Sequence, residues 1–156
     1  MERCGGLPGI GICKVTGPDG YNYEPLWMHP SEAVKRDIRH GDIVKIFNHR
    51  GVVLAGAYVT ERVMPGVVYI DHGARADAIK VGEIDRGGAI NTISPEGIIS
   101  ENCVGQATSG YLVQIERLSW AQMDQWRRDY PEAFQRKYDR AAGLRFDAWV
   151  VGGDKQ

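Results

Sequence analysis

The sequence IRHGDIVKIFNHRGVVL, residues 38–54, carries the clearest structural signals in this chain. Gly41 and Asp42 form a turn in which the Asp42 carboxylate can accept backbone N–H groups and fix the start of a strand. Two apolar runs follow, and the turn between them is flanked by Asn48 and Gly51, which is a hairpin signal. A Gly-Asp turn that leads into a short, strongly apolar strand is typical of small closed β-barrels.

The composition is that of an ordinary globular domain. The 156 residues are 43% hydrophobic and 25% charged, which predicts one domain with a tail. The formal net charge of −1 gives no electrostatic reason to expect a nucleic acid or an anionic membrane as partner. No apolar run approaches the ~20 residues of a membrane-spanning helix, and the first residues lack the apolar core of a signal peptide.

Cysteine usage bears on the compartment and on metal binding. The three cysteines include no Cys-x-x-Cys pair, which argues against a disulfide framework and against a zinc site. Reduced thiols predict a cytoplasmic protein, with the periplasm as the alternative if the chain is exported as part of a larger one. The four histidines show no metal-ligand spacing.

The sequence predicts three parts. Residues 1–24 are rich in Gly and Pro and are expected to be an extended lead-in that lies against another part of the molecule. Residues 25–118 contain the predicted strands and form the barrel. Residues 119–156 are a helical C-terminal extension and tail, in which Ser119 is the predicted N-cap and Pro131 starts a second helical piece.

The C-terminal extension has an apolar helical face. Its two helices are predicted at 120–129 and 132–141, and its large apolar side chains recur at helical spacing. This pattern predicts packing on a core or on another domain, so in an isolated domain we expect the face to be exposed or covered only by self-association. The residues of the face are Trp120, Met123, Trp126 and Tyr130.

The barrel is predicted from four apolar runs and a short helix. The helix at 31–38 should lie against one end of the barrel and bury Ala33, Val34 and Ile38. The strands are expected at 42–48, 51–59, 67–70 and 111–118. The predicted core consists of Val44, Ile46, Val53, Leu54, Val68, Ile70, Leu112, Val113 and Ile115.

The long irregular stretch at 71–110 is the best candidate for binding. Gly88 belongs to a glycine pair that would let the backbone approach a ligand, and Asn91 offers a donor and an acceptor that suit the edge of a heterocycle. Thr92 and Ser94 can bond phosphate or ribose oxygens. Residues 100–110 repeat this chemistry; the alternative is a pair of polar surface loops.

No catalytic arrangement is predicted. The sequence lacks a Ser-His-Asp order, a Gly-x-Ser-x-Gly elbow, a Walker loop and a Rossmann Gly-x-Gly-x-x-Gly stretch after a strand. Asp71 and His72 are adjacent, but neighbours on an extended segment point in opposite directions and do not make a dyad. We therefore assign no catalytic residue and no metal ligand.

Residues 24–118 resemble the C-terminal dinucleotide-binding domain of molybdopterin oxidoreductases of the dimethyl sulfoxide reductase family. The resemblance rests on the order and spacing of several short motifs. Within that family the chain is most similar to the large subunit of pyrogallol–phloroglucinol transhydroxylase, because of stretches at 20–25, 71–75 and 100–105. The family motifs are Trp27-Met28-His29-Pro30-Ser31-Glu32-Ala33, Ile38-x-x-Gly41-Asp42-x-Val44, Asn48-x-Arg50-Gly51, Pro65-Gly66-Val67-Val68 and Gly87-x-x-x-Asn91-x-Ile93-Ser94.

The resemblance implies a mainly β fold with short helices, namely a double-psi β-barrel of the aspartate-decarboxylase-like class. It also implies a molybdenum or tungsten bis(molybdopterin guanine dinucleotide) cofactor. Ile93 and Ser94 stand where the family more usually has Leu-Thr, which keeps one apolar and one hydroxyl side chain. The cofactor-binding residues expected by this likeness are Asn91, Thr92, Ser94, Gly88, Asn102, Arg50 and His29.

Two functions of different classes follow. Relatives in this family are several times longer, so the chain is expected to be a non-catalytic domain or fragment of a molybdopterin oxidoreductase or transhydroxylase. Its partners would then be the remaining domains of that enzyme, with an iron–sulfur subunit as a further candidate. The alternative is a stand-alone β-barrel module for protein–protein interaction, docking through the helix of Trp120 and Trp126. An aspartate-decarboxylase-like enzyme would need a self-processing Gly-Ser pair, which the sequence lacks.

Overall fold

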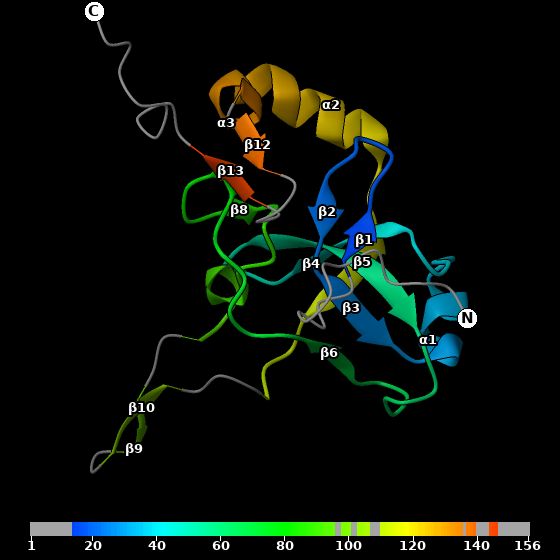
Figure 1. Cartoon of the computed structure of the whole chain (residues 1–156). Helices are drawn as coiled ribbons and strands as arrows, with labels where there is room; N and C mark the ends of the chain where they lie inside the picture. The colour runs from blue at the N-terminus through cyan, green and yellow to red at the C-terminus, as the bar shows by residue number, and fades with distance from the viewer. Residues whose placement is uncertain are drawn as a thin grey trace, which may run out of the picture.

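A computed structural model describes residues 14–95, 98–100, 103–106, 110–135, 137–139 and 144–146 (Figure 1). The predicted class, mainly β with short helices, is confirmed. The largest sheet among the described residues has seven strands, five of them in the order β11-β4-β5-β3-β6. These five are β11 (Gln114–Arg117), β4 (Ile43–Phe47), β5 (Val52–Val59), β3 (Pro25–Met28) and β6 (Val68–Ile70).

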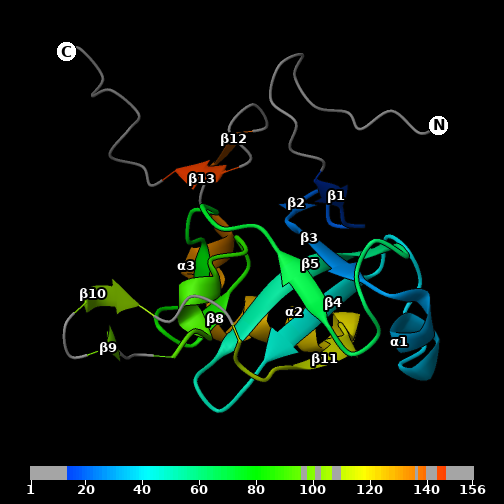
Figure 2. The same cartoon turned by 90° about the horizontal axis from the view of Figure 1, so that it is seen from below.

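The remaining elements surround this sheet. Two short strands, β7 and β8, join it beside β5, and three two-stranded hairpins lie outside it. Figure 2 shows α1 at one end of the sheet and the β9–β10 hairpin at the other. These elements are α1 (Pro30–Lys35), β7 (Ala78–Lys80), β8 (Ile84–Asp85), η1 (Ile90–Thr92), α2 (Trp120–Asp129), α3 (Pro131–Gln135) and the hairpins β1 (Val15–Thr16) with β2 (Asn22–Tyr23), β9 (Ile98–Ser100) with β10 (Cys103–Gln106), and β12 (Lys137–Asp139) with β13 (Leu144–Phe146).

Strand β5 is the centre of the sheet. One of its edges pairs with β4 in antiparallel fashion, and the other pairs in parallel first with β8 and then with β3. The hairpin β1–β2 crosses close to β5 at Gly56, where an added Cβ would lie 2.2 Å from the Cβ of Val15. A side chain at position 56 would therefore collide with Val15, and glycine lets the hairpin lie against the central strand.

The four predicted strands are confirmed, within a few residues, as β4, β5, β6 and β11. The sequence pattern did not reveal β3, β7 or β8, because each is too short to show an apolar alternation. The described strands form an open sheet, since β6 and β11 are its two ends and do not pair. Closure into a double-psi barrel stays a prediction.

The first core cluster lies between the sheet and α1 and contains most of the predicted core. Val44, Ile46 and Val53 are buried in it, and Ile115 joins them. Leu54, also predicted, is buried in a second cluster. Val68, Ile70 and Val113 are half-buried and pack against the first cluster.

Two predictions of burial are wrong, namely Val34 on the inner face of the helix and Leu112 in the core. Val34 is 80% exposed, because α1 ends at Lys35 and its inner face is supplied by Ala33. Leu112 is 92% exposed, because β11 begins only at Gln114 and the preceding extended residues alternate. Tyr111 and Val113 face the core, so Leu112 between them points away.

The second cluster buries the C-terminal helix. Met123 and Trp126 of α2 pack with Tyr21 and Tyr23. The expectation that the Trp120, Met123 and Trp126 face would be exposed is therefore wrong, because the two tyrosines of the lead-in supply its apolar partner. Among the described residues, no helix combines the length and apolar character needed to cross a bilayer.

The second C-terminal helix is shorter than predicted. It starts at Pro131 as expected, but α3 ends at Gln135 and the next three described residues form strand β12. The prediction of helix to residue 141 is wrong, since antiparallel pairing of β12 with β13 overrides the helical composition.

The turn before β4 is held as predicted. The Asp42 carboxylate accepts the Arg39 N–H at 2.8 Å, and the Asp42 N–H donates to the Arg39 carbonyl at 3.0 Å. Gly41 has a φ of 89°, which only glycine adopts without strain, and its N–H bonds Ala57 of β5. The turn therefore joins the end of the α1 segment to the central strand.

Replacing this carboxylate should weaken the fold. We expect Asp42→Ala to lower the free energy of unfolding by about 1 kcal/mol, because the Arg39 N–H loses its acceptor but lies near water. Chemical denaturation measures this, with the exposed Glu61→Ala as the matched control. Equal midpoints for Asp42→Ala and the parent would contradict the role of the turn.

Candidate functional site

Two segments far apart in the sequence meet beside β5. The Asn48 side-chain amide donates to the Ile93 carbonyl at 2.8 Å, and its oxygen accepts the Arg50 N–H at 2.9 Å. Gly51 lies so close to the second segment that an added Cβ would be 2.8 Å from the Cγ2 of Thr92. The hairpin turn 48–51 is thus fixed against η1 by a hydrogen bond and by close packing.

The contact of these segments creates a hollow of about 690 Å³, which we call the polar hollow. Four of the seven predicted binding residues line it, together with Gly82 from the turn between β7 and β8. Arg50 is the only charged side chain among its described lining residues. The residues of the polar hollow are Arg50, Gly82, Asn91, Thr92 and Ser94.

The lining side chains differ in how free they are to bind. Arg50 and Asn91 are exposed, whereas Thr92 and Ser94 are half-buried. The Ser94 hydroxyl donates to the Ile90 carbonyl at 2.9 Å and lies 3.4 Å from the Tyr111 hydroxyl. Ser94 therefore stabilises η1 with its proton and keeps acceptor capacity on its oxygen.

A buried arginine supports the loop that carries these residues. Arg86 is only 1% exposed. Its Nε lies 3.2 Å from the Asp77 carboxylate, and its Nη2 donates to the Ala133 carbonyl of α3 at 2.9 Å. The guanidinium also stacks between Tyr21 and Phe134, at 4.8 and 4.5 Å from the ring centres.

The carboxylate of Asp85 continues this network toward the polar hollow. It accepts the N–H groups of Asp77 at 2.8 Å and of Ala89 at 2.9 Å. Burial raises the pKa of Asp85, and these N–H donors oppose that rise. Burial and the nearby Asp77 carboxylate likewise raise the pKa of Tyr21, whose hydroxyl donates to Asp77. The network fixes the chain up to Ala89, directly before η1.

The other three predicted binding residues are not among those that line the polar hollow. Gly88 has a φ of 93°, and an added Cβ would lie 2.3 Å from Cγ of Glu24, so its place is in the packing behind the loop. His29 caps α1, where its Nδ1 accepts the Ser31 N–H at 3.2 Å. Asn102 lies outside the described residues.

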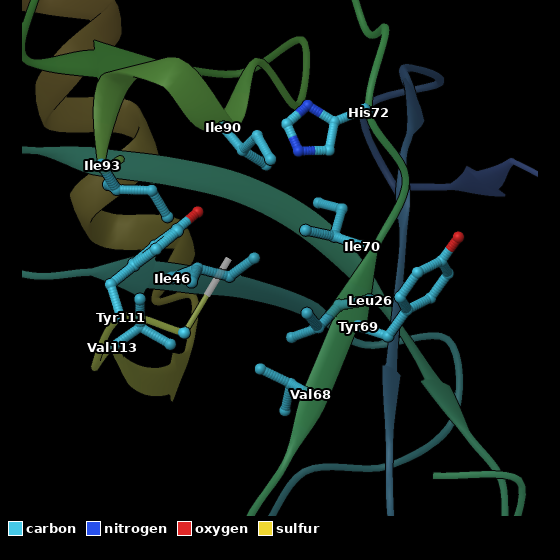
Figure 3. A pocket seen from close by; sticks show the side chains of 11 residues that line it. Leu26, Ile46, Val68, Tyr69, Ile70, His72, Ile90, Ile93, Tyr111 and Val113 are labelled. Carbon is cyan, nitrogen blue, oxygen red and sulfur yellow. The ribbon is translucent and has the colours of Figure 1, made fainter. Parts of the chain in front are cut away.

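A second hollow lies on the other side of η1. It is a groove of about 240 Å³, which we call the apolar groove, and Figure 3 shows its side chains converging from β6, η1 and the segment before β11. The His72 ring lies at one end beside Ile90 (Figure 3), and the Asp71 carboxylate accepts a hydrogen bond from the Tyr69 hydroxyl. The apolar groove is lined by Leu26, Ile46, Val68, Tyr69, Ile70, His72, Ile90, Ile93, Gly110, Tyr111 and Val113.

The sequence did not point to the Arg86 network or to the apolar groove. The sequence signal that could have indicated the network is the charged pair Asp85-Arg86 directly ahead of the glycine pair at 87–88. Within the described ranges, no group of three or more His, Cys, Asp or Glu side chains is placed to hold a metal ion. The arrangement around the polar hollow offers hydrogen bonds and one positive charge, which is the chemistry of binding an anionic, heterocyclic ligand.

The chain is similar in sequence to known proteins. Residues 15–106 match the profile of the Molydopterin dinucleotide binding domain. The chain is 43% identical over 99 residues to "Trimethylamine-N-oxide reductase 1" of Escherichia coli O6:H1, and 38% identical over 98 residues to "Trimethylamine-N-oxide reductase" of Haemophilus influenzae. It is 40% identical over 96 residues to "Probable dimethyl sulfoxide reductase chain YnfF" of Escherichia coli K12. These matches include 60–61% of this chain but only 11–12% of the length of the relatives.

Removing the buried arginine should damage the fold beneath the polar hollow. We expect Arg86→Met to lower the free energy of unfolding by about 3–5 kcal/mol, because it leaves the buried Asp77 carboxylate without its cation. Thermal unfolding measures the loss, with the exposed Arg128→Met of α2 as the matched control. A loss below about 1 kcal/mol would contradict the supporting role of Arg86.

Proposed function

This chain belongs to the Molydopterin dinucleotide binding domain family, and from that premise we propose that its polar hollow holds the guanine nucleotide part of a molybdopterin guanine dinucleotide. The observation that carries the proposal is the convergence of Arg50, Asn91, Thr92 and Ser94 around one hollow. Two segments far apart in the sequence, the turn 48–51 and the stretch 91–94, supply these four side chains, so a chance grouping of neighbouring polar residues does not explain it.

Each side chain suits one part of such a ligand. The Arg50 guanidinium can bind phosphate oxygens in a bidentate manner. The Asn91 amide can donate to and accept from the edge of guanine. Thr92 and Ser94 can bond ribose or phosphate oxygens. No carboxylate is among the described lining residues, so the hollow does not repel a phosphate.

The chain would act as a binding domain within a larger enzyme. The molybdenum or tungsten that the cofactor carries would supply the chemistry of oxygen-atom or hydroxyl transfer. This chain's residues would bind and orient the nucleotide, and the isolated chain should turn over no substrate. Its partners would be the remaining domains of the enzyme, with an iron–sulfur subunit as a further candidate. We place this enzyme in the cytoplasm, or in the periplasm if it is exported, which cell fractionation tests.

The substrate class of the whole enzyme is also part of the proposal. The names of the relatives refer to reduction of trimethylamine N-oxide and dimethyl sulfoxide. The likeness to pyrogallol–phloroglucinol transhydroxylase rests partly on residues 20–25, and in the structure Tyr21 and Tyr23 of this stretch are buried packing residues. We therefore favour reduction of an N-oxide or sulfoxide over hydroxyl transfer.

The alternative function, a stand-alone module for protein–protein interaction, loses the surface that was predicted for it. Met123 and Trp126 of α2 face the second core cluster, so the helix does not present them to a partner.

Removing the Asn91 amide should weaken nucleotide binding. With guanosine diphosphate as the probe, we expect Asn91→Ala to raise the Kd about tenfold, because a lost hydrogen bond to the base is worth about 1.4 kcal/mol. Calorimetry on the full chain measures this. The matched control is Asn22→Ala in β2, which should leave the Kd unchanged. Equal Kd values for Asn91→Ala and the parent would remove Asn91 from the site.

A further inference from the structure

We propose that the apolar groove accepts one extended β-strand from another part of the same molybdoenzyme, and that this strand closes the sheet between β6 and β11. The identity of the donor as part of a molybdoenzyme rests on the proposed function. The presence and the shape of the groove do not depend on the proposed function.

The first observation concerns the backbone at the two ends of the sheet. Among the described residues, β6 pairs only with β3, and β11 pairs only with β4. Each therefore has a second edge whose N–H and C=O groups find no partner strand in the described part of the chain. The apolar groove is lined from both sides of this gap, by Val68 and Ile70 of β6 and by Tyr111 and Val113 before β11.

The second observation is the length of the gap. A neighbouring hollow of about 360 Å³ shares Val68, Tyr111 and Val113 with the apolar groove and continues past Ile115 to Glu32 of α1. Together the two hollows follow the open edge of the sheet from η1 to α1. An elongated space between two strand edges fits an extended segment, whereas a helix is about 10 Å wide and would leave both edges unpaired.

The third observation is where large apolar side chains remain exposed. Three of the six found in the described ranges line one of the two hollows. Clustered apolar exposure of this kind marks an interaction surface. These exposed residues are Val67, Tyr69 and Leu112, and the half-buried Val68, Ile70 and Val113 stand next to them.

The pairing pattern fixes how the added strand must run. β5 is antiparallel to β4 and parallel to β3, while β11 is antiparallel to β4 and β6 is antiparallel to β3. Consequently β6 and β11 run in opposite directions, and a strand between them is parallel to one and antiparallel to the other. Its inward side chains would be apolar and would cover Val68, Ile70 and Val113.

The source of the strand follows from the chain lengths. The chain covers only 11–12% of the length of its relatives, so most of such an enzyme lies outside it. The strand would also stabilise the nucleotide site, since η1 borders both hollows. Ile90 and Ile93 face the apolar groove, whereas Asn91 and Thr92 line the polar hollow.

Hydrogen exchange with peptide probes tests the proposal on the full chain. The probes are 15-residue peptides that tile the part of Escherichia coli O6:H1 trimethylamine-N-oxide reductase 1 outside the matched region. We expect one of these peptides, or two that overlap, to slow amide exchange in both β6 and β11 at least tenfold. Methylation of alternate backbone amides in that peptide removes strand pairing without changing the protein, so the methylated peptide should give no protection.

Variants of the full chain locate the binding surface. Val113→Lys should abolish protection by the peptide. The matched control Val81→Lys, at a site that is 84% exposed and outside both hollows, should leave the protection unchanged. Both variants should bind guanosine diphosphate like the parent, so a failure of strand binding is separable from a failure of the proposed function.

Three results would overturn the proposal. The first is that no peptide protects both edges. The second is that both edges are already protected in the dilute, monomeric chain, because a segment of this chain outside the described ranges then fills the groove. The third is protection that grows with chain concentration, which would identify a second copy as the occupant.

Discussion

The ion pair of Arg86 with Asp77 is the interaction on which the polar hollow depends most. It buries a positive charge between two aromatic rings and ties the loop before η1 to the lead-in hairpin on one side and to α3 on the other. Such a pair contributes little net stability compared with an apolar core, but loss of one member is costly. The position of the loop is therefore strongly specified. The Asp85 carboxylate accepts the N–H of Ala89, the residue before η1, and so also fixes the start of η1.

From this fixed loop, η1 presents different chemistry to its two sides. Its apolar residues face the apolar groove, and its polar residues line the polar hollow, where the turn 48–51 adds Arg50. The contact between Asn48 and Ile93 keeps the two sides together. A domain built in this way can bind an anionic heterocycle without its own residues taking part in a reaction. Strand closure and nucleotide binding would then stabilise the same short segment.

The sequence predicted the parts of the fold that carry strong local signals. The Gly41-Asp42 turn, the hairpin β4–β5 and the start of α2 all follow from turn, strand and cap residues, whereas the binding role of the η1 stretch stays a prediction. Leu112 was placed in the core because its run is apolar, although β11 starts only at Gln114 and the residue points outward. The burial of the α2 face could not be foreseen, since its partners Tyr21 and Tyr23 lie about a hundred residues away in a segment without apolar periodicity. Pairing over such separations leaves no local signal.

Nuclear magnetic resonance titration of the full chain with guanosine diphosphate tests the central claim most directly. We expect the backbone amide signals of Arg50, Gly82, Asn91, Thr92 and Ser94 to shift together and to saturate with one Kd, while those of β6 and α2 stay in place. Shifts confined to the apolar groove, or no saturable shift at millimolar nucleotide, would contradict the assignment of the polar hollow as the dinucleotide site.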